Sequence, residues 1–101
     1  MELTAGSRWR SAVCDTEVIV VHPADGSRHL GCGGSDMVPH DGGSADGSPD
    51  PSLSGGTLLG KRYADESTGL EVLCTKAGVG TLTLDGSVLE VKSAKPLPSS
   101  D

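Results

Sequence analysis

The chain contains no phenylalanine, and Trp9 and Tyr63 are its two aromatic residues. In 101 residues this scarcity leaves Val and Leu to supply most of the buried apolar area. Segments much shorter than about 40 residues rarely fold without a metal, a disulfide or a partner surface. The length therefore allows one ordinary domain, or two very small ones that need such help. No aromatic-lined cleft and no recognisable nucleophile and base are present, so we do not expect an enzyme.

Basic residues are also scarce, since eight Lys and Arg against fourteen Asp and Glu give a formal net charge of −6. Nucleic-acid binding needs clustered cations that neutralise phosphates. The longest apolar run, residues 18–21, is too short to cross a membrane, and the N-terminal residues do not form a signal peptide. Three cysteines, an odd number, fit a reducing compartment better than a disulfide framework. We expect a soluble cytoplasmic protein without a nucleic-acid or membrane partner.

Residues 39–57 are dominated by Gly, Ser, Pro and Asp, which offer nothing to bury. This composition predicts a flexible acidic linker. Strand-like runs rich in Val, Leu and Thr lie on either side of it, at 17–21, 69–75, 80–84 and 88–91. No window has a sustained apolar helical period, so we expect an all-β fold with no helix longer than one turn.

The two sides of the linker repeat one order of features. Each has a glycine, an aromatic residue, a turn, an apolar strand, a Gly-containing hairpin loop and a short strand ending in a Gly turn. The corresponding segments are 6–9 with 60–63 and 30–38 with 82–90. The sequence thus predicts two small β modules, at 1–38 and 58–101, the second ending in an extended tail.

A set of residues in the first module carries a family resemblance: Gly6, Trp9, the strand 18–21, Leu30, Cys32, Gly34, Asp36 and Met37. In order and spacing they resemble desulforedoxin, the small iron protein of the rubredoxin class, and the related N-terminal domain of desulfoferrodoxin. The resemblance covers most of residues 6–38 and, more faintly, 60–91. It implies two small antiparallel rubredoxin-like modules that pack as a pseudo-dimer, an intrachain imitation of the desulforedoxin homodimer.

The family holds its iron with four cysteines, and this chain departs from that pattern. The matching positions are Ser11, Cys14, Cys32 and Gly33 in the first module and Asp65, Thr68, Leu84 and Asp85 in the second. A tetrahedral site of this class needs four soft ligands. The family's electron transfer is therefore not expected here, and no cofactor is predicted.

Cys14 and Cys32 remain the candidate metal ligands, and three interpretations of them stay open. They could be vestigial residues that fill space, because free cysteine is among the most buried residue types. They could form a partial site for Zn or Fe, completed by a residue from the set Ser11, Asp36, His22 and His29. They could also form a disulfide that replaces the metal as a clip. Cys74, inside a Val-Leu strand, is expected to be a core residue.

These features favour a non-enzymatic accessory or interaction protein, a small subunit that docks on a larger enzyme or complex. Docking would use exposed strand edges or the tail at 94–98. The alternative is a metal-binding or redox module that uses Cys14 and Cys32.

Overall fold

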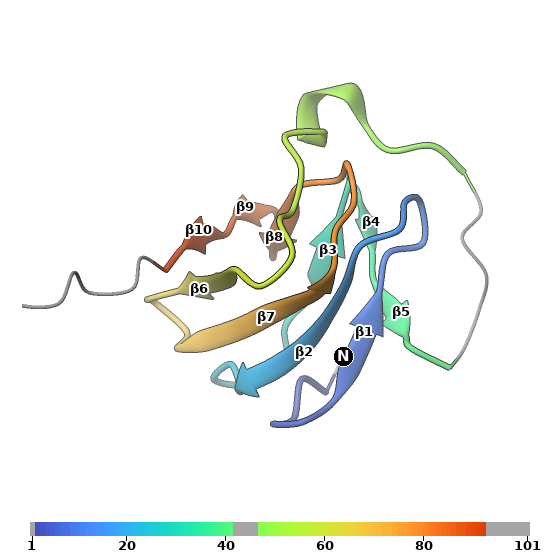
Figure 1. Cartoon of the computed structure of the whole chain (residues 1–101). Coiled ribbons are helices and arrows are strands. Elements are labelled where there is room, and N and C mark those ends of the chain that lie inside the picture. The colour runs from blue at the N-terminus through green and yellow to red at the C-terminus, as the bar shows by residue number, and fades with distance from the viewer. Residues whose placement is uncertain (1, 42–46, 93–101) are drawn as a thin grey trace, which may run out of the picture.

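A computed structural model describes residues 2–41 and 47–92 and confirms the all-β class (Figure 1). Two antiparallel sheets make up the fold. The helical element in the described ranges is η1, a single 3₁₀ turn at Pro51–Leu53. This agrees with the expectation that no helix exceeds one turn.

The larger sheet has six strands in the order β10-β6-β7-β2-β1-β5. Its centre is the pair β2–β7, the two longest strands, which lie side by side in Figure 1. Val and Leu at alternate positions give these strands a buried face. In chain order the strands are β1 (Arg8–Arg10), β2 (Glu17–His22), β5 (Val38–Pro39), β6 (Arg62–Asp65), β7 (Leu70–Lys76) and β10 (Glu90–Val91).

The smaller sheet has four strands in the order β4-β3-β8-β9 and consists of two tight hairpins joined through β3 and β8. Both loops have two residues with positive φ, Gly33 and Gly34 at 66° and 92° and Asp85 and Gly86 at 50° and 85°. This backbone is the primed turn that matches strand twist and favours Gly and Asp. The strands are β3 (Leu30–Cys32), β4 (Ser35–Asp36), β8 (Leu82–Leu84) and β9 (Ser87–Val88).

Each predicted strand run has a counterpart in the structure, with one of them divided. The run at 17–21 is β2, that at 69–75 is β7 and that at 80–84 contains β8. The run at 88–91 is split between β9 and β10 at Leu89, which is 5% exposed. The split arises because the chain passes from the end of one sheet to the end of the other, with Leu89 turned into the core between them.

Both sheets draw strands from both halves of the chain, since β2 pairs with β7 and β3 pairs with β8. The strand orders also have a symmetry. If β1 is exchanged with β6, β2 with β7, and so on to β5 with β10, each of the two strand orders is reproduced in the reverse direction. The sequence suggested one small antiparallel β module in each half, but the halves share their sheets. The pairing of β2 with β7 across the halves is the longest ladder in the described part of the chain.

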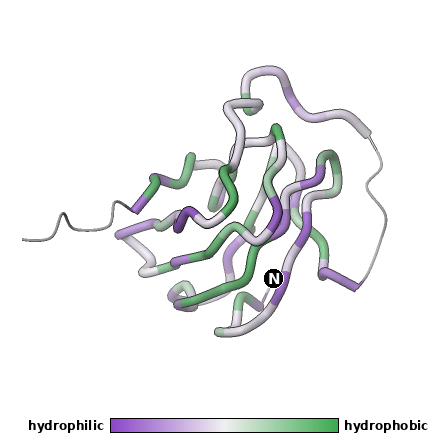
Figure 2. The backbone as a smooth tube through the Cα atoms, viewed as in Figure 1, coloured by the Kyte–Doolittle hydropathy of each residue, from purple (hydrophilic) through white to green (hydrophobic). Residues whose placement is uncertain are grey.

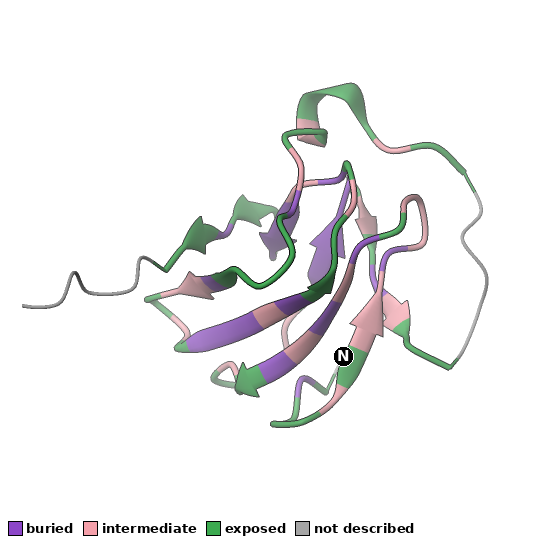
Figure 3. Cartoon of the chain, in the orientation of Figure 1, coloured by how far each residue is buried: buried purple, intermediate pink, exposed green. Residues whose placement is uncertain are grey.

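One cluster of buried side chains fills the space between the sheets. Apolar residues concentrate along β2 and β7 (Figure 2), and the buried positions lie on these strands and on β3 and β8 (Figure 3). Its fully buried aliphatic members are Val18, Val20, Leu30, Leu70, Val72 and Leu82. Trp9 packs against the cluster and Tyr63 is buried in it. The fold therefore has a single core to which both halves contribute.

The segment 39–57, expected to be a linker, makes defined contacts where the structure describes it. Pro39 belongs to β5. Asp50 N donates to Gly33 O at 2.7 Å, and Thr57, 1% exposed, exchanges two backbone hydrogen bonds with Gly78. The Asp50 carboxylate caps η1, which fixes the chain locally despite its polar composition. Residues 47–57 are therefore attached to the sheets.

The expected tail at 94–98 lies outside the described residues. Within the ranges described, no helix combines the length and the apolar character needed to cross a membrane.

Candidate functional site

The first candidate site begins with the turn between β1 and β2, which Ser11 closes. Ser11 is 1% exposed, and its Oγ accepts hydrogen bonds from the backbone N–H groups of Val13 and Cys14, both at 3.1 Å. Ser11 N in turn donates to Thr16 O at 2.8 Å. These bonds hold the turn in shape and fix the direction of the Cys14 side chain.

The turn brings Cys14 next to Cys32, which comes from the end of β3. Their sulfur atoms are 3.8 Å apart, and both thiols are free. Cys32 is completely buried, whereas Cys14 is partly exposed. The Cys14 thiol also donates to Thr16 Oγ1 at 3.2 Å. The structure thus pairs the two cysteines that the sequence singled out.

The loop after β7 covers this pair and belongs to the other half of the chain. A Cβ placed on Gly80 would lie 2.8 Å from Cys32 Sγ and 3.1 Å from Cys14 Sγ. A Cβ on Gly78 would lie 2.5 Å from Thr16 N and 3.1 Å from Cys14 Sγ. Such distances leave no room for a side chain, so glycine at both positions lets the backbone approach the sulfur atoms.

The two thiols differ in their tendency to ionise. Burial opposes the thiolate of Cys14, but hydrogen bonds with Ser11 and Thr16 outweigh it and lower the pKa of Cys14 to about 7. Burial, together with the nearby Cys14 charge, raises the pKa of Cys32 to about 12 despite the hydrogen bonds with Thr16 and Ser11. Cys14 is therefore the more reactive thiol of the pair, because the thiolate is the nucleophile.

The residues around the pair do not fit a tetrahedral metal site. Of the proposed additional ligands, Ser11 is adjacent, but its Oγ already accepts two backbone hydrogen bonds. Asp36 lies 3.4 Å from His29 at the surface, and His22 Nδ1 is 2.8 Å from Gly69 O. Over 2–41 and 47–92, no three His, Cys, Asp or Glu side chains are grouped so that they could hold an ion. Two thiols and hydroxyls do not reproduce the four soft ligands of the family's iron site.

The turn between β6 and β7 in the second half carries a carboxylate, that of Asp65. Asp65 Oδ2 accepts from Thr68 N at 3.2 Å and from Thr68 Oγ1 at 2.7 Å. Leu84 is buried, and Asp85 accepts from His29 N at 2.9 Å. Both turns are therefore closed by side-chain hydrogen bonds of their own.

Cys74 occupies a different environment, in the middle of β7. It is 1% exposed, and its thiol donates to Lys76 O at 3.2 Å. Burial raises its pKa. Its location agrees with the expectation of a core residue, and it provides an internal reference for the other two cysteines.

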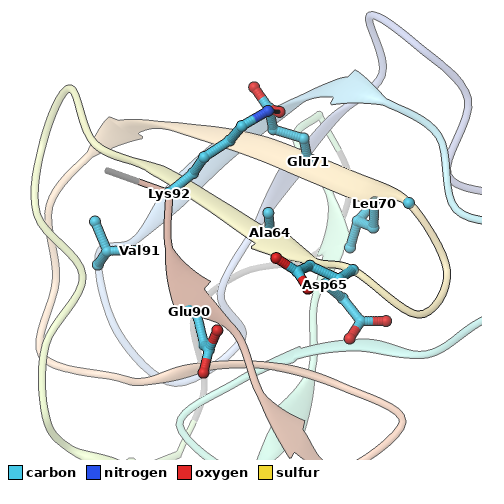
Figure 4. A pocket seen from close by; sticks show the side chains of 9 residues that line it. Ala64, Asp65, Leu70, Glu71, Glu90, Val91 and Lys92 are labelled. Carbon is cyan, nitrogen blue, oxygen red and sulfur yellow. Dashed lines mark hydrogen bonds and ion pairs between the residues drawn. The ribbon is translucent and has the colours of Figure 1, made fainter. Parts of the chain in front are cut away.

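Sequence reasoning missed a charged cluster beside a hollow of about 410 Å³ on the outer side of the larger sheet. Glu71, only 8% exposed, accepts from Lys92 at 2.7 Å and from Arg62 at 3.1 Å. Figure 4 shows Lys92 extended to Glu71, with Asp65 and Glu90 also lining the hollow. The available signal was a single acid within the apolar run of β7. Its partners come from two other segments, so spacing could not identify them.

This cluster predicts a pH dependence of stability. The hydrogen bond from Lys92 lowers the pKa of Glu71 against the effect of burial, and the charges of Lys92 and Arg62 lower it further. A lowered folded-state pKa stabilises the protein above the unfolded value, about 4.3, and this stability is lost as the pH falls through the folded value. We expect Glu71→Gln to cost about 1 kcal/mol at pH 7 and much less at pH 3.

Urea unfolding at both pH values measures this difference. Glu66→Gln, at an exposed turn position of the same hollow, is the control and should change stability little at either pH. An equal cost of Glu71→Gln at pH 7 and pH 3 would contradict the electrostatic origin.

None of the family models matches the chain, and no curated protein or solved structure matches it significantly.

Proposed function

We propose that the chain is a non-enzymatic interaction protein, a small cytoplasmic subunit that docks on a larger enzyme or complex. Its scaffold is a desulforedoxin-like fold that has lost its iron site. Support comes from the two turns that match the family's metal-binding positions. Ser11 and Asp65 close them with hydrogen bonds, so the scaffold keeps its shape without an ion.

The interpretation of the halves as tandem copies is part of this proposal. Gly6 N donates to Val20 O at 2.8 Å, and Gly60 N donates to Cys74 O at 2.9 Å. The bonds that follow the two tight hairpins also correspond: Met37 N to Leu30 O at 2.8 Å and Leu89 N to Leu82 O at 3.0 Å. Together with the symmetric strand order, these bonds support a pseudo-dimer built from one chain.

The observation that carries the docking proposal is a difference between the two ends of the larger sheet. At one end Pro39 of β5 stands opposite Trp9, and at the other end Val91 of β10 stands opposite Tyr63. The next residue in each case donates inward, His40 N to Arg8 O at 3.1 Å and Lys92 N to Arg62 O at 2.7 Å. Backbone N–H groups alternate in direction along a strand. The backbone nitrogen of the preceding residue, Pro39 or Val91, therefore faces outward, away from the sheet.

Proline has no N–H group, so β5 lacks an outward donor at that position, while Val91 has one. No strand of the described chain lies beyond β10. Val91 is 49% exposed, and Val88, in the adjoining β9, is 56% exposed. The corresponding residues of the first half are Asp36 and Pro39, both of which protect an edge. The edge of β10 is therefore the open one, suited to an added strand from a partner.

The partner's strand is expected to be basic, because the chain carries a net charge of −6 and Glu90 lies on this edge. A reducing compartment fits the three free cysteines.

Val91→Pro tests the proposal, since it gives β10 the same residue that β5 has. We expect the variant to melt within a few degrees of the wild type but to lose the complex recovered from the native host. The bound protein is identified by mass spectrometry after affinity capture and size-exclusion chromatography. Pro39→Val, the reciprocal variant, should retain the complex. Recovery of the same complex with Val91→Pro, or of free wild-type monomer alone, would count against docking at β10.

The second candidate function is a redox module that uses Cys14 and Cys32. It is favoured by the separation of 3.8 Å between the two sulfur atoms.

A further inference from the structure

We propose that Cys14 and Cys32 form a redox-active dithiol that reduces disulfides, with Cys14 as the attacking thiol and Cys32 as the resolving thiol. The proposal goes beyond docking at β10 and does not depend on it. It assigns a chemical activity to the pair, with disulfide-containing compounds as the substrate class.

The first argument is the distance between the sulfur atoms. A disulfide bond is about 2.05 Å long and forms where the two side chains already face each other. At 3.8 Å, Cys14 Sγ and Cys32 Sγ are in van der Waals contact and point toward one another. Cys14 lies in a turn between β1 and β2, outside the strand ladders. A modest adjustment of this turn can therefore close the bond without breaking either sheet.

The second argument is the difference in access between the two thiols. Cys32 is 0% exposed, so no external disulfide can reach its sulfur directly. Cys14 is partly exposed in the turn between β1 and β2, and its sulfur lies 3.8 Å from that of Cys32. An external disulfide can thus react first with Cys14 alone. The order of the two steps follows from burial.

The third argument is the set of groups around Cys14. Thr16 Oγ1 lies 3.2 Å from Cys14 Sγ, and its hydroxyl hydrogen can turn toward the sulfur when the thiol loses its proton. The Ser11 side chain also interacts with both the Cys14 and the Cys32 thiol, and in each case this favours the thiolate. A thiolate at Cys14 would therefore be stabilised by neutral donors already in place, which Cys74 in β7 does not have.

In the first step, Cys14 Sγ attacks one sulfur of the substrate disulfide. The substrate S–S bond breaks, a mixed disulfide forms, and the other half of the substrate leaves as a thiolate. In the second step, Cys32 Sγ attacks Cys14 Sγ and releases the remaining half as a second thiolate. The dithiol loses two electrons and the substrate gains them, and the two protein thiol protons end on the two product thiols.

The test exposes the full chain, fully reduced, to oxidised glutathione and counts thiols after denaturation. We expect the count to fall from three per chain to the Cys74 thiol alone, with the loss of two hydrogens in the intact mass. Dithiothreitol should restore all three. Alkylation of the wild type at early times should identify Cys14 as the site of any mixed disulfide. Cystine as a second substrate, and a small disulfide-bonded protein as a third, distinguish small from macromolecular disulfides.

Two variants separate the roles. Cys32→Ala should accumulate the mixed disulfide at Cys14, and Cys14→Ser should react at least about tenfold more slowly at Cys32, because that thiol is buried. Cys74→Ala is the matched control and should oxidise like the wild type. The early-time measurement on the wild type holds even if a variant fails to fold.

Three thiols remaining in excess oxidised glutathione would overturn the proposal. The proposal would also be overturned if the mixed disulfide formed first at Cys32, or if tightly bound zinc blocked the oxidation. Loss of the β10 complex in Val91→Pro would leave these results unchanged, so the two proposals can fail separately.

Discussion

Residues 58–101 expressed alone are expected to be unfolded, and so is the fragment 1–57. Each fragment loses its partner strand in both sheets, because β2 pairs with β7 and β3 pairs with β8. The buried faces of Leu70, Val72 and Leu82 would become exposed. Without these buried faces, each fragment buries too little apolar area to offset its chain entropy.

Circular dichroism and thermal melts of both fragments and of the full chain measure this effect. The full chain should melt cooperatively, whereas each fragment should show no transition. Mixing the fragments should restore part of the strand signal, which distinguishes loss of pairing from a damaged fragment. A sharp two-state melt of 58–101 alone would mean that the second half contains its own core and would contradict the shared-sheet fold.

Leu30→Ala is expected to lower the free energy of unfolding by about 3 kcal/mol. This value is typical of the removal of a fully buried leucine side chain when the cavity does not collapse. Leu30 is 0% exposed and pairs with Leu84 where the two halves meet in the smaller sheet. Small domains have a total stability of about 5–15 kcal/mol, so this loss is a large fraction. Urea unfolding gives the change in free energy directly.

Val88→Ala provides the control, since Val88 is 56% exposed on β9 and its truncation should cost less than about 0.5 kcal/mol. Equal effects of the two substitutions would contradict the position of the core between the sheets.

The strands and turns could be predicted from the sequence because they depend on local patterns. Runs rich in Val, Leu and Thr identified β2 and β7, and the Gly turns expected within 30–38 and 82–90 correspond to the turns at 33–34 and 85–86. The choice between pairing within a half and across the halves could not be predicted. That choice depends on which faces meet in three dimensions, and the local pattern of these strands is compatible with either pairing.

The candidate site was predictable in part, for similar reasons. The family pattern indicated Cys14 and Cys32, and the structure places their sulfur atoms 3.8 Å apart. It does not bring Asp36, His22 or His29 to them, because these side chains bond elsewhere at the surface. The covering glycines Gly78 and Gly80 come from the other half of the chain, and no motif in the sequence connects them to the cysteines.

The segment 47–57 differs from its expected role as a linker for a reason that composition cannot reveal. Its polar residues act as hydrogen-bonding groups, with the Asp50 carboxylate bound to Ser52 N at 2.9 Å and the Thr57 hydroxyl donating to Gly80 O at 2.7 Å. Ser, Asp and Gly serve equally in flexible chains and in tight turns. Thr57 thus helps to hold the loop that covers the two cysteines.

Native mass spectrometry of the full chain, purified without chelators, tests most directly whether the scaffold carries a dithiol in place of a metal. We expect the mass of the metal-free chain, with well under one metal ion per chain, because the two thiols of this site are fewer than the four soft ligands that a tetrahedral metal site needs. After oxidised glutathione is added, this mass should fall by two hydrogens, and dithiothreitol should reverse the change. A chain that carries one zinc or iron ion through dialysis, and loses it only when Cys14 or Cys32 is replaced, would contradict this account.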